Sequence, residues 1–301
     1  MKSIIPSLSY NSMFKAVFSN NKIVLSKLVQ AILEYYKIDI DVKDKELIIR
    51  NNELLLDNYK DKQLICDYII KLDDSSDLNI EVNRSYYTGL TERNLAYSFK
   101  IFYEHFKSGD DYKEFHKYTL LQVNFNHFSN YNNKTINRYY MLNMDDITNK
   151  LSANFSIMNI DIEKCFSIVY NNSNLEEVSD LEKWSAIIAC NYLEDIDSIL
   201  ESGLLSMDEK KKFLSDIKEK SKDKDVLEAI KFEDSIDYRF KAVEEDAYNR
   251  GIEQGIEQGI EQNTINIIKT MLAKKISYED ISEISGKSIE EIKEIEKSMK
   301  D

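Results

Sequence analysis

The sequence predicts an α/β protein in which a sheet flanked by helices precedes a mainly helical C-terminal region. Short apolar segments at 63–72, 78–84 and 118–126 have the length and the composition of strands. Apolar residues at helical spacing precede and follow them, at 11–36 and 91–108. One proline and seven glycines in 301 residues predict long, uninterrupted elements.

The first predicted element is a single helix over residues 11–36. Within it Leu25, Leu28 and Ile32 recur three and four residues apart, which is the spacing of one helix face. Two apolar runs close together then predict a strand at 46–56.

The next two strands each contain one acid in an apolar setting. Asp67 lies within the segment 63–72 and Glu81 within 78–84, and the polar residues 73–77 predict a hairpin turn between them. A buried carboxylate is costly unless it is paired or bound to a cation. Two such acids on neighbouring strands offer the hard oxygen ligands that Mg²⁺ requires, so we expect a metal site here.

The remaining elements of this half follow in order. The helix 91–108 is predicted to end at Gly109, which suits a helix C-cap, and the strand 118–126 comes next. Further strand-like signals lie at 136–141 and 155–170.

These residues carry a resemblance to a known family. Asp67 followed by Glu81-Val82-Asn83 resembles the motif of the PD-(D/E)XK nucleases, an Asp and then Glu-x-Lys or Glu-x-Gln. The order of elements, together with tandem Gly-Ile-Glu-Gln repeats from Gly251, resembles the Rpn-type, transposase-associated branch. The resemblance implies a restriction-endonuclease-like core with a mixed central sheet. It also implies metal-dependent hydrolysis of DNA phosphodiesters, linked to recombination or mobile elements.

The resemblance also implies roles for individual residues. Asp67 and Glu81 are expected to hold Mg²⁺ or Mn²⁺, with the backbone carbonyl of Val82 as a further ligand. Asn83 stands where the family has Lys or Gln to orient a water molecule. It keeps the amide of Gln but is one methylene shorter.

Three further residues are expected to be accessory to the site. Glu34 is the acid of the first helix, and Arg93 and Tyr97 share one face of the helix 91–108. The alternatives are a solvated Glu34 and a surface ion pair of Arg93 with Glu92 or Asp110.

The two acids themselves also have a purely structural alternative. Asp67 and Glu81 would then form salt bridges with Lys71 or Arg84 of the hairpin and bind no metal.

The net charge of −14 argues against broad electrostatic binding of DNA. DNA as a partner therefore requires a local basic patch or an oligomeric groove. The basic residues near the acids in the sequence, each equally interpretable as a solvated charge, are Lys15, Lys22, Lys27, Arg84, Arg93 and Lys100.

Other functional classes have little support in the sequence. The three cysteines are far apart in apolar runs, which predicts reduced core thiols and a cytoplasmic location. No apolar run is long enough to span a membrane, and the N-terminus lacks a signal-peptide core. The three histidines lack zinc-site spacing, and glycines are too few for a phosphate-binding loop.

The C-terminal half is predicted to be helical from Val178 onward. We expect a nuclease-like domain at 1–175, a helical region at 176–250, and a repeat helix with a small tail at 251–301. The repeat has a period of four, which aligns Gly and Ile as adjacent stripes on a helix. Either this face packs closely in a homo-oligomer or the segment is a solvated linker helix.

The tail predicts two short helices around Gly286, resembling a miniature helix-turn-helix. Ser277 and Ser288 are expected to cap them. Their expected shared core is Ile281, Ile284, Ile289 and Ile292. The acids Glu290 and Glu291 open the second helix and repel phosphate, so a structural or self-association role is favoured over DNA reading.

Two functions therefore compete. The first is a metal-dependent DNA endonuclease. The second is a catalytically weakened protein of the same fold that acts as an oligomeric interaction module. Retention of Asp67 and Glu81 favours the first, whereas Asn83 and the excess of 54 acids over 40 bases favour the second.

Overall fold

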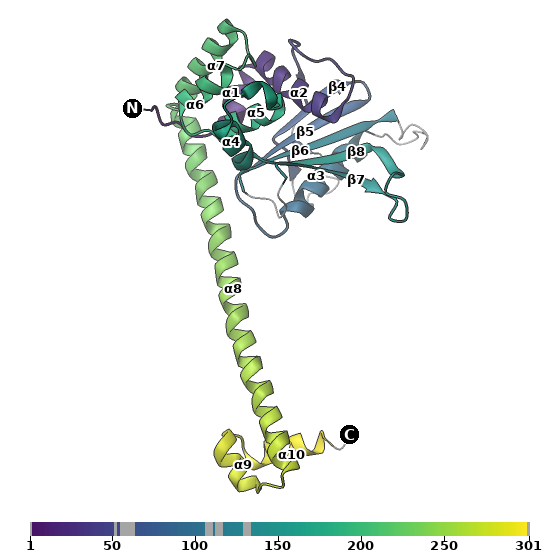
Figure 1. Ribbon diagram of the computed structural model, residues 1–301, viewed down its shortest axis with the longest axis vertical. Helices are drawn as coiled ribbons and strands as arrows, with labels where there is room; N and C mark the ends of the chain where they lie inside the picture. The colour runs from purple at the N-terminus through teal and green to yellow at the C-terminus, as the bar shows by residue number, and fades with distance from the viewer. Residues whose placement is uncertain are drawn as a thin grey trace. The chain divides into compact units, whose positions relative to one another are not determined.

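The computed structural model describes residues 2–50, 53–54, 64–105, 111, 117–128 and 134–299. The chain divides into two units, Met1–Asp237 and Tyr238–Asp301, which are described separately. A mixed sheet with helices on both faces forms the centre of the first unit (Figure 1). The predicted α/β fold class is therefore confirmed.

The main sheet has six strands in the order β1-β4-β5-β6-β8-β7. Its strands are β1 (Ile48–Ile49), β4 (Tyr68–Asp73), β5 (Ser76–Asn83), β6 (Thr119–Asn126), β7 (Ile136–Leu142) and β8 (Lys150–Asp161). β4 and β5 form the predicted antiparallel hairpin, while β5, β6 and β8 run parallel to one another. β2 (Glu53–Leu54) and β3 (Leu64–Ile65) pair separately.

Helices precede, separate and follow these strands. In the first half they are α1 (Asn11–Ser19), α2 (Lys22–Tyr36), α3 (Leu90–Glu104) and α4 (Ile162–Asn171). They are followed by the 3₁₀ helix η2 (Leu175–Glu177), α5 (Asp180–Ala189), α6 (Leu193–Leu200), α7 (Met207–Lys220) and α8 (Lys224–Ala273). The last two are α9 (Tyr278–Ser285) and α10 (Ile289–Lys297).

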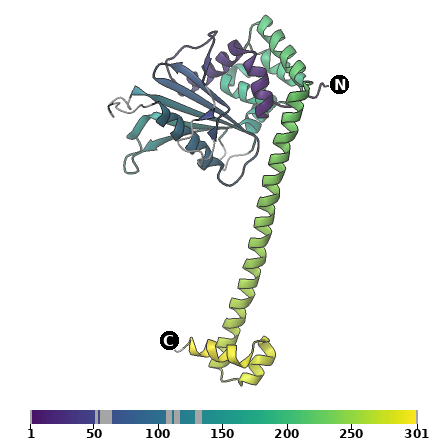
Figure 2. The ribbon, with the colours of Figure 1, turned by 180° about the vertical axis from the view of Figure 1, so that it is seen from behind.

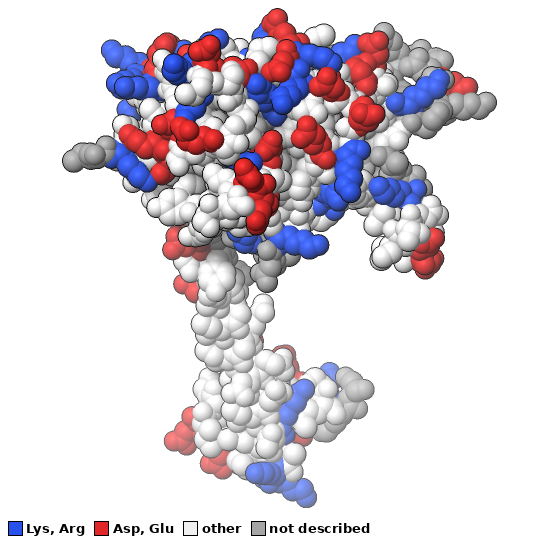
Figure 3. All heavy atoms as spheres, turned by 45° about the horizontal axis from the view of Figure 1, so that its top comes forward, with Lys and Arg blue, Asp and Glu red and all other residues white. Residues whose placement is uncertain are grey.

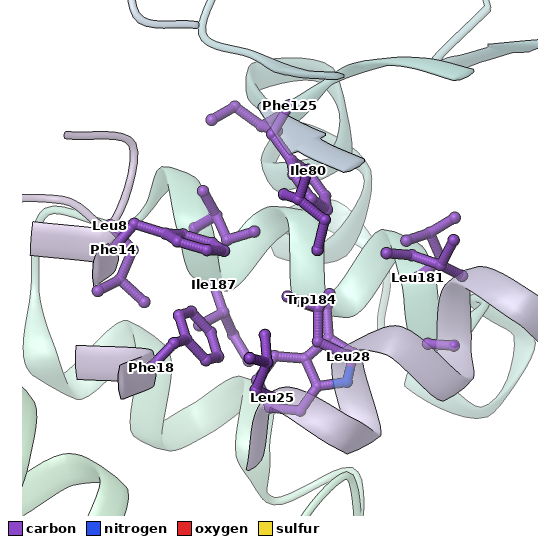
Figure 4. Packing of buried hydrophobic residues seen from close by; sticks show 14 of the residues in the cluster. Leu8, Phe14, Phe18, Leu25, Leu28, Ile80, Phe125, Leu181, Trp184 and Ile187 are labelled. Carbon is purple, nitrogen blue, oxygen red and sulfur yellow. The ribbon is translucent and has the colours of Figure 1, made fainter. Parts of the chain in front are cut away.

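Strand alternation gives the sheet two different faces. On β5 the apolar residues Leu78, Ile80 and Val82 lie on one face, where they share a core with α1, α2 and α5. Residues of that core are drawn in Figure 4, among them Phe14, Phe18, Leu25, Leu28, Ile80, Phe125, Leu181, Trp184 and Ile187. Burial of these large side chains holds the helical layer against the sheet.

The other face packs against α3 (Figure 1, and from behind in Figure 2). Apolar residues fill one end of this interface, including Ile69, Ile101 and Leu120. Toward the carboxyl ends of β5 and β6 the same face becomes polar, since the sequence alternates Asn79, Glu81, Asn83 on β5 and Gln122, Asn124, Asn126 on β6. This change of polarity places the candidate site.

The prediction of one helix at 11–36 is wrong, because the helix breaks between Ser19 and Lys22. The side-chain Nδ2 of Asn21 donates to the carbonyl of Val17 at 2.7 Å. In an unbroken helix that carbonyl accepts from the backbone N–H of residue 21. An Asn side chain that takes this bond competes with the helix and ends it.

The prediction of strand at 155–170 is correct only to Asp161. There the Asp161 side chain accepts from the backbone N–H of Lys164 at 3.0 Å and caps α4. An acid at this position starts a helix by satisfying one of its unpaired N–H groups. The apolar residues that follow belong to α4, with Ile162, Cys165 and Val169 buried on one face.

Other predicted boundaries differ in detail. The segment 63–72 is not one strand, because β3 ends at Ile65 and β4 begins at Tyr68. Of the segment 46–56, residues 48–49 and 53–54 form separate strands, and 51–52 and 55–56 lie outside the described residues. The helix predicted at 91–108 ends at Glu104, and Gly109 also lies outside the described residues.

The first turns of α8 belong to the first unit and are fastened to its N-terminal segment. Glu233 accepts hydrogen bonds from the backbone N–H groups of Asn11 and Ser12, at 3.0 and 2.8 Å, and so caps α1. Asp234 accepts from the Tyr10 hydroxyl at 3.0 Å. The helices from α4 to the start of α8 thus form one compact unit with the sheet.

The second unit contains the end of α8 with α9 and α10. Ser277 and Ser288 cap the two short helices as predicted, and Gly286 makes the turn with a φ of 71°. Ile281 and Ile292 are buried together with Ile268 of α8. The prediction that Ile284 joins this core is wrong, since it is 62% exposed and α8 supplies the third buried residue instead.

Within the described part of the chain, no helix combines the length and the apolar character needed to cross a bilayer.

Candidate active site

The two predicted acids meet at the carboxyl end of β5. The antiparallel hairpin pairs Tyr68 with Ile80. Asp67, which precedes Tyr68, therefore lies beside Glu81, which follows Ile80. The backbone N–H of Asp67 donates to Glu81 Oε1 at 3.2 Å, and the backbone N–H of Val82 donates to Asp67 Oδ2 at 2.8 Å. The expected position of Asp67 inside a strand is wrong, because it occupies the bend just before β4.

Both carboxylates are buried, with Asp67 7% and Glu81 2% exposed. Burial raises the pKa of Asp67. Burial first, and then the charge of Asp67, raises the pKa of Glu81 to about 8. Two ionised acids this close in a buried setting require compensating positive charge.

Two basic side chains from distant segments supply positive charge here. Lys15 of α1 lies with its Nζ 3.5 Å from Asp67 Oδ1. Arg93 of α3 places its Nη2 3.9 Å from Glu81 Oε2. Their charges act against burial and lower the pKa values of the two acids.

Lys15 appears among the predicted flanking bases but not among the predicted site residues. Its side chain comes from α1, which precedes Asp67 by about fifty positions and is not part of the hairpin. One sequence signal was present, because Lys15 is the only charged residue of α1. A single charge in an otherwise uncharged helix favours an ionised partner, because an unpaired charge is costly to bury.

Asn83 is held on the same face of β5 as Glu81. Its Oδ1 accepts from Arg93 Nη2 at 2.5 Å, and its Nδ2 donates to Asn126 Oδ1 at 2.9 Å. These two bonds fix the orientation of the amide. The predicted triplet of Asp67, Glu81 and Asn83 is therefore brought together.

The predicted accessory residues divide into two groups. Tyr97 lies in the site, where the guanidinium carbon of Arg93 is 5.4 Å from its ring centre. Burial raises the pKa of Tyr97 to about 12, so its hydroxyl is a hydrogen-bond donor at neutral pH. Glu34 lies elsewhere, exposed on α2, where it accepts a hydrogen bond from Gln30.

The structural alternative for the acids is not what the structure contains. Lys71 pairs with Asp74 at 2.6 Å, and Arg84 lies 3.8 Å from Asp234 of α8. Neither base of the hairpin therefore neutralises Asp67 or Glu81. Lys15 lies beside Asp67 and Arg93 beside Glu81 instead.

The oxygen donors present suit a hard divalent cation. Mg²⁺ is commonly held by one or two carboxylates, with waters and substrate phosphates completing its shell. Asp67 and Glu81 provide two adjacent carboxylates of this kind. Over the residues that the structure describes, no group of three or more His, Cys, Asp and Glu side chains gathers into a metal cluster. The two carboxylates fit Mg²⁺ or Mn²⁺ and not a histidine-rich zinc site.

A family model described as PD-(D/E)XK nuclease family transposase matches residues 10–242. The chain belongs to this family. No curated protein and no solved structure matches it. The matched residues of this PD-(D/E)XK family member include Lys15, both acids, Asn83 and Arg93.

The match also covers the helices that follow the sheet of this PD-(D/E)XK family member, as far as residue 242 in α8. The match ends before the Gly-Ile-Glu-Gln repeats at 251. Membership supports a nuclease-like function that acts on phosphodiester bonds.

Proposed function

We propose that the protein is a metal-dependent DNA endonuclease, and that it serves recombination or mobile elements as Rpn-type nucleases do. The observation that carries the proposal is the buried Asp67–Glu81 pair, joined through the backbone and flanked by Lys15 and Arg93. Burying a pair of acids lowers the stability of the fold. A cation site on a nuclease fold would explain why the pair is present.

Asp67 and Glu81 would hold Mg²⁺ or Mn²⁺, with the backbone carbonyl of Val82 as a further ligand. When bound, the cation acts as a Lewis acid and lowers the pKa of a bound water. The protein's own groups do the rest. Arg93 and Lys15 neutralise charge on the phosphate, and Asn83, held by Asn126, orients the attacking water.

Contact with DNA is expected to be local. On the face that Figure 3 shows, Lys and Arg side chains are interspersed with Asp and Glu. Arg84 follows Asn83 directly and stacks on Tyr10, with 3.6 Å between its guanidinium carbon and the ring centre. We expect Arg84, Arg93 and Lys15 to carry the phosphate contacts, with a weaker salt dependence than that of a broadly basic protein.

The test is cleavage of supercoiled plasmid in Mg²⁺ or Mn²⁺, with EDTA as the blank. The variants are Asp67→Asn and Glu81→Gln, which keep the size of each side chain. Glu34→Gln is the matched control, because Glu34 is an exposed acid outside the site. Cleavage lost in both site variants and kept in the control supports the proposal. Equal cleavage by Glu81→Gln and the wild type contradicts it.

A second function has its own observation. On α8 the repeat isoleucines Ile252, Ile256 and Ile260 are 43, 57 and 63% exposed, and a Cβ added at Gly255 would meet open space. A stripe of exposed isoleucine on a helix favours packing against a second copy. In this alternative the protein is a catalytically weakened interaction module. Light scattering after gel filtration, for the wild type and Ile256→Glu, tests it.

We also propose that the protein acts in the cytoplasm. Cys66, Cys165 and Cys190 are all buried as thiols, as expected in a reducing compartment. Mass measurement of the protein with and without alkylation under native conditions tests whether they stay protected.

A further inference from the structure

Asn79 is a buried amide that contacts the candidate metal ligand directly. It lies two residues before Glu81 on β5, so both side chains are on the same face of the sheet. Its Nδ2 donates to Glu81 Oε1 at 3.2 Å and to Gln122 Oε1 at 2.7 Å. The side chain is fully buried.

The orientation of the Asn79 amide is set by residues of two other elements. Gln122 of β6 accepts from the hydroxyl of Ser98 on α3 at 2.9 Å, and its own Nε2 donates to Asn124 Oδ1 at 2.6 Å. The carbonyl of Gln122 therefore faces Asn79. Exchanging the oxygen and nitrogen of Asn79 would place an acceptor against two acceptors.

The other end of the same amide indicates what the arrangement serves. Asn79 Oδ1 is buried and accepts no hydrogen bond from the residues that the structure describes. Leaving a buried carbonyl without a donor is unfavourable. Despite this unfavourable free energy, the Asn79 amide is oriented with its NH₂ group toward Glu81.

The two carboxylate oxygens of Glu81 have different contacts. Oε1 receives both the Asn79 amide and the backbone N–H of Asp67, each at 3.2 Å. Oε2 faces Arg93 at 3.9 Å, a distance beyond direct hydrogen bonding. The Cys66 thiol is a further hydrogen-bond partner of the Glu81 side chain. The two N–H donors of Asn79 and Asp67 both hold Oε1, and Oε2 lies on the side of Arg93.

We propose that Asn79, held by Gln122 and Ser98, is a positioning residue that orients Glu81 so that Oε2 binds the divalent cation. This inference rests on the proposed function and adds a residue to it. Groups that hydrogen-bond to metal ligands commonly change metal affinity by about 10- to 100-fold. Glutamate has three rotatable side-chain bonds, so a buried donor that fixes its rotamer removes an ordering cost from cation binding.

The experiment measures Mn²⁺ binding to the full chain by calorimetry, with no substrate present. Asn79→Leu keeps the approximate size of the side chain and removes the donor. Asn159→Leu is the matched control, because Asn159 accepts from Asn124 at the far end of the same amide network. We expect Asn79→Leu to weaken Mn²⁺ binding by about 10- to 100-fold and the control to change it by less than about threefold.

Folding is checked separately by thermal unfolding in EDTA. If Asn79→Leu does not fold, Ser98→Ala replaces it, since that change removes a single hydroxyl, which lies 2.9 Å from Gln122 Oε1 and 2.9 Å from the carbonyl of Asn94 one turn earlier in α3. A smaller loss of Mn²⁺ affinity in the same direction is then expected.

The possible outcomes separate this inference from the proposed function. If the wild type does not bind Mn²⁺, the proposed function fails. If the wild type binds and the folded Asn79→Leu or Ser98→Ala variant binds equally well, the positioning role is overturned. The role is also overturned if Asn159→Leu loses as much affinity as Asn79→Leu, because the effect would then belong to the network as a whole.

Discussion

The backbone N–H of Asp67 lies 3.2 Å from Glu81 Oε1, so one acid of the pair is a hydrogen-bond donor to the other. The carboxylate of Asp67 in turn accepts from the N–H of Val82 at 2.8 Å. This reciprocal arrangement holds the two carboxylates together against their charge repulsion. The arrangement forms because the pairing of β4 with β5 ends at Tyr68 and Ile80, one residue before Asp67 and Glu81.

The metal-free protein is expected to lose stability as the pH rises from about 5 to 8. The pKa of Glu81 is raised from 4.5 to about 8 in the folded state, and that of Asp67 is also raised. In this window the folded protein keeps a proton that the unfolded chain has lost. One carboxyl that stays protonated only in the folded state, as Glu81 does here, lowers the free energy of unfolding by about 1.4 kcal/mol per pH unit.

Urea unfolding in EDTA at several pH values measures this slope. Glu81→Gln removes the titrating group, so its slope should be shallower than that of the wild type. Ionisable groups away from the site contribute to both proteins alike, so the difference between the two slopes reports Glu81 together with Asp67, whose charge raises the pKa of Glu81. Parallel slopes would show that Glu81 is already ionised in the folded protein.

Lys15→Met is expected to move cation binding to higher pH. Lys15 lies 3.5 Å from Asp67 Oδ1, and its charge lowers the pKa of that acid. Without it Asp67 holds its proton more tightly, and the proton competes with the cation. In measurements from pH 6 to 9, the Mn²⁺ affinity should therefore rise at a higher pH in the variant than in the wild type. Lys22→Met is the control, since Lys22 pairs with the exposed Glu46. Superimposable curves for Lys15→Met and the wild type would contradict the expectation.

Arg93→Gln is expected to reduce plasmid cleavage by about 100-fold or more and, as with Lys15→Met, to move Mn²⁺ binding to higher pH without abolishing it, because the charge of Arg93 lowers the pKa of Glu81. The reason is that Arg93 faces Glu81 and Asn83 without belonging to the ligand set, so its charge acts on the phosphate. Arg138→Gln is the control, because Arg138 is an exposed arginine on β7. Loss of Mn²⁺ binding at every pH from 6 to 9 together with cleavage would assign Arg93 to the folding of the site instead.

Glu233→Gln is expected to destabilise the first unit by about 1 kcal/mol, because the charge of Glu233 caps the N-terminus of α1. For a unit of this size the thermal midpoint should fall by about 2–4 °C. Glu228→Gln is the control on the same helix, since Glu228 is exposed. Equal midpoints for the two variants would show that the cap contributes nothing measurable.

The errors in the predicted elements have a common cause. The apolar spacing across 11–36 is the same whether or not the helix breaks, and the break depends on a single side-chain bond of Asn21 to Val17. Likewise, the apolar run after Phe155 suits a strand and a helix equally until Asp161 caps α4. Ile284 has the right spacing for a core residue, but Ile268 of α8 occupies that role. The apolar spacing of a segment describes that segment alone and carries no information about the segments that pack against it.

The sequence by itself determined that Asp67 and Glu81 meet, because a short polar turn and strand alternation are local and decide which residues of a hairpin are adjacent. It also determined the caps of α9 and α10, which depend on residues three positions apart. Only the tertiary structure decided the surroundings of the acids. Lys15, Arg93 and Gln122 come from three different elements, and their approach follows from how α1, α3 and β6 pack on β5. Packing between distant segments depends on the burial of whole faces, which no local pattern in the sequence records.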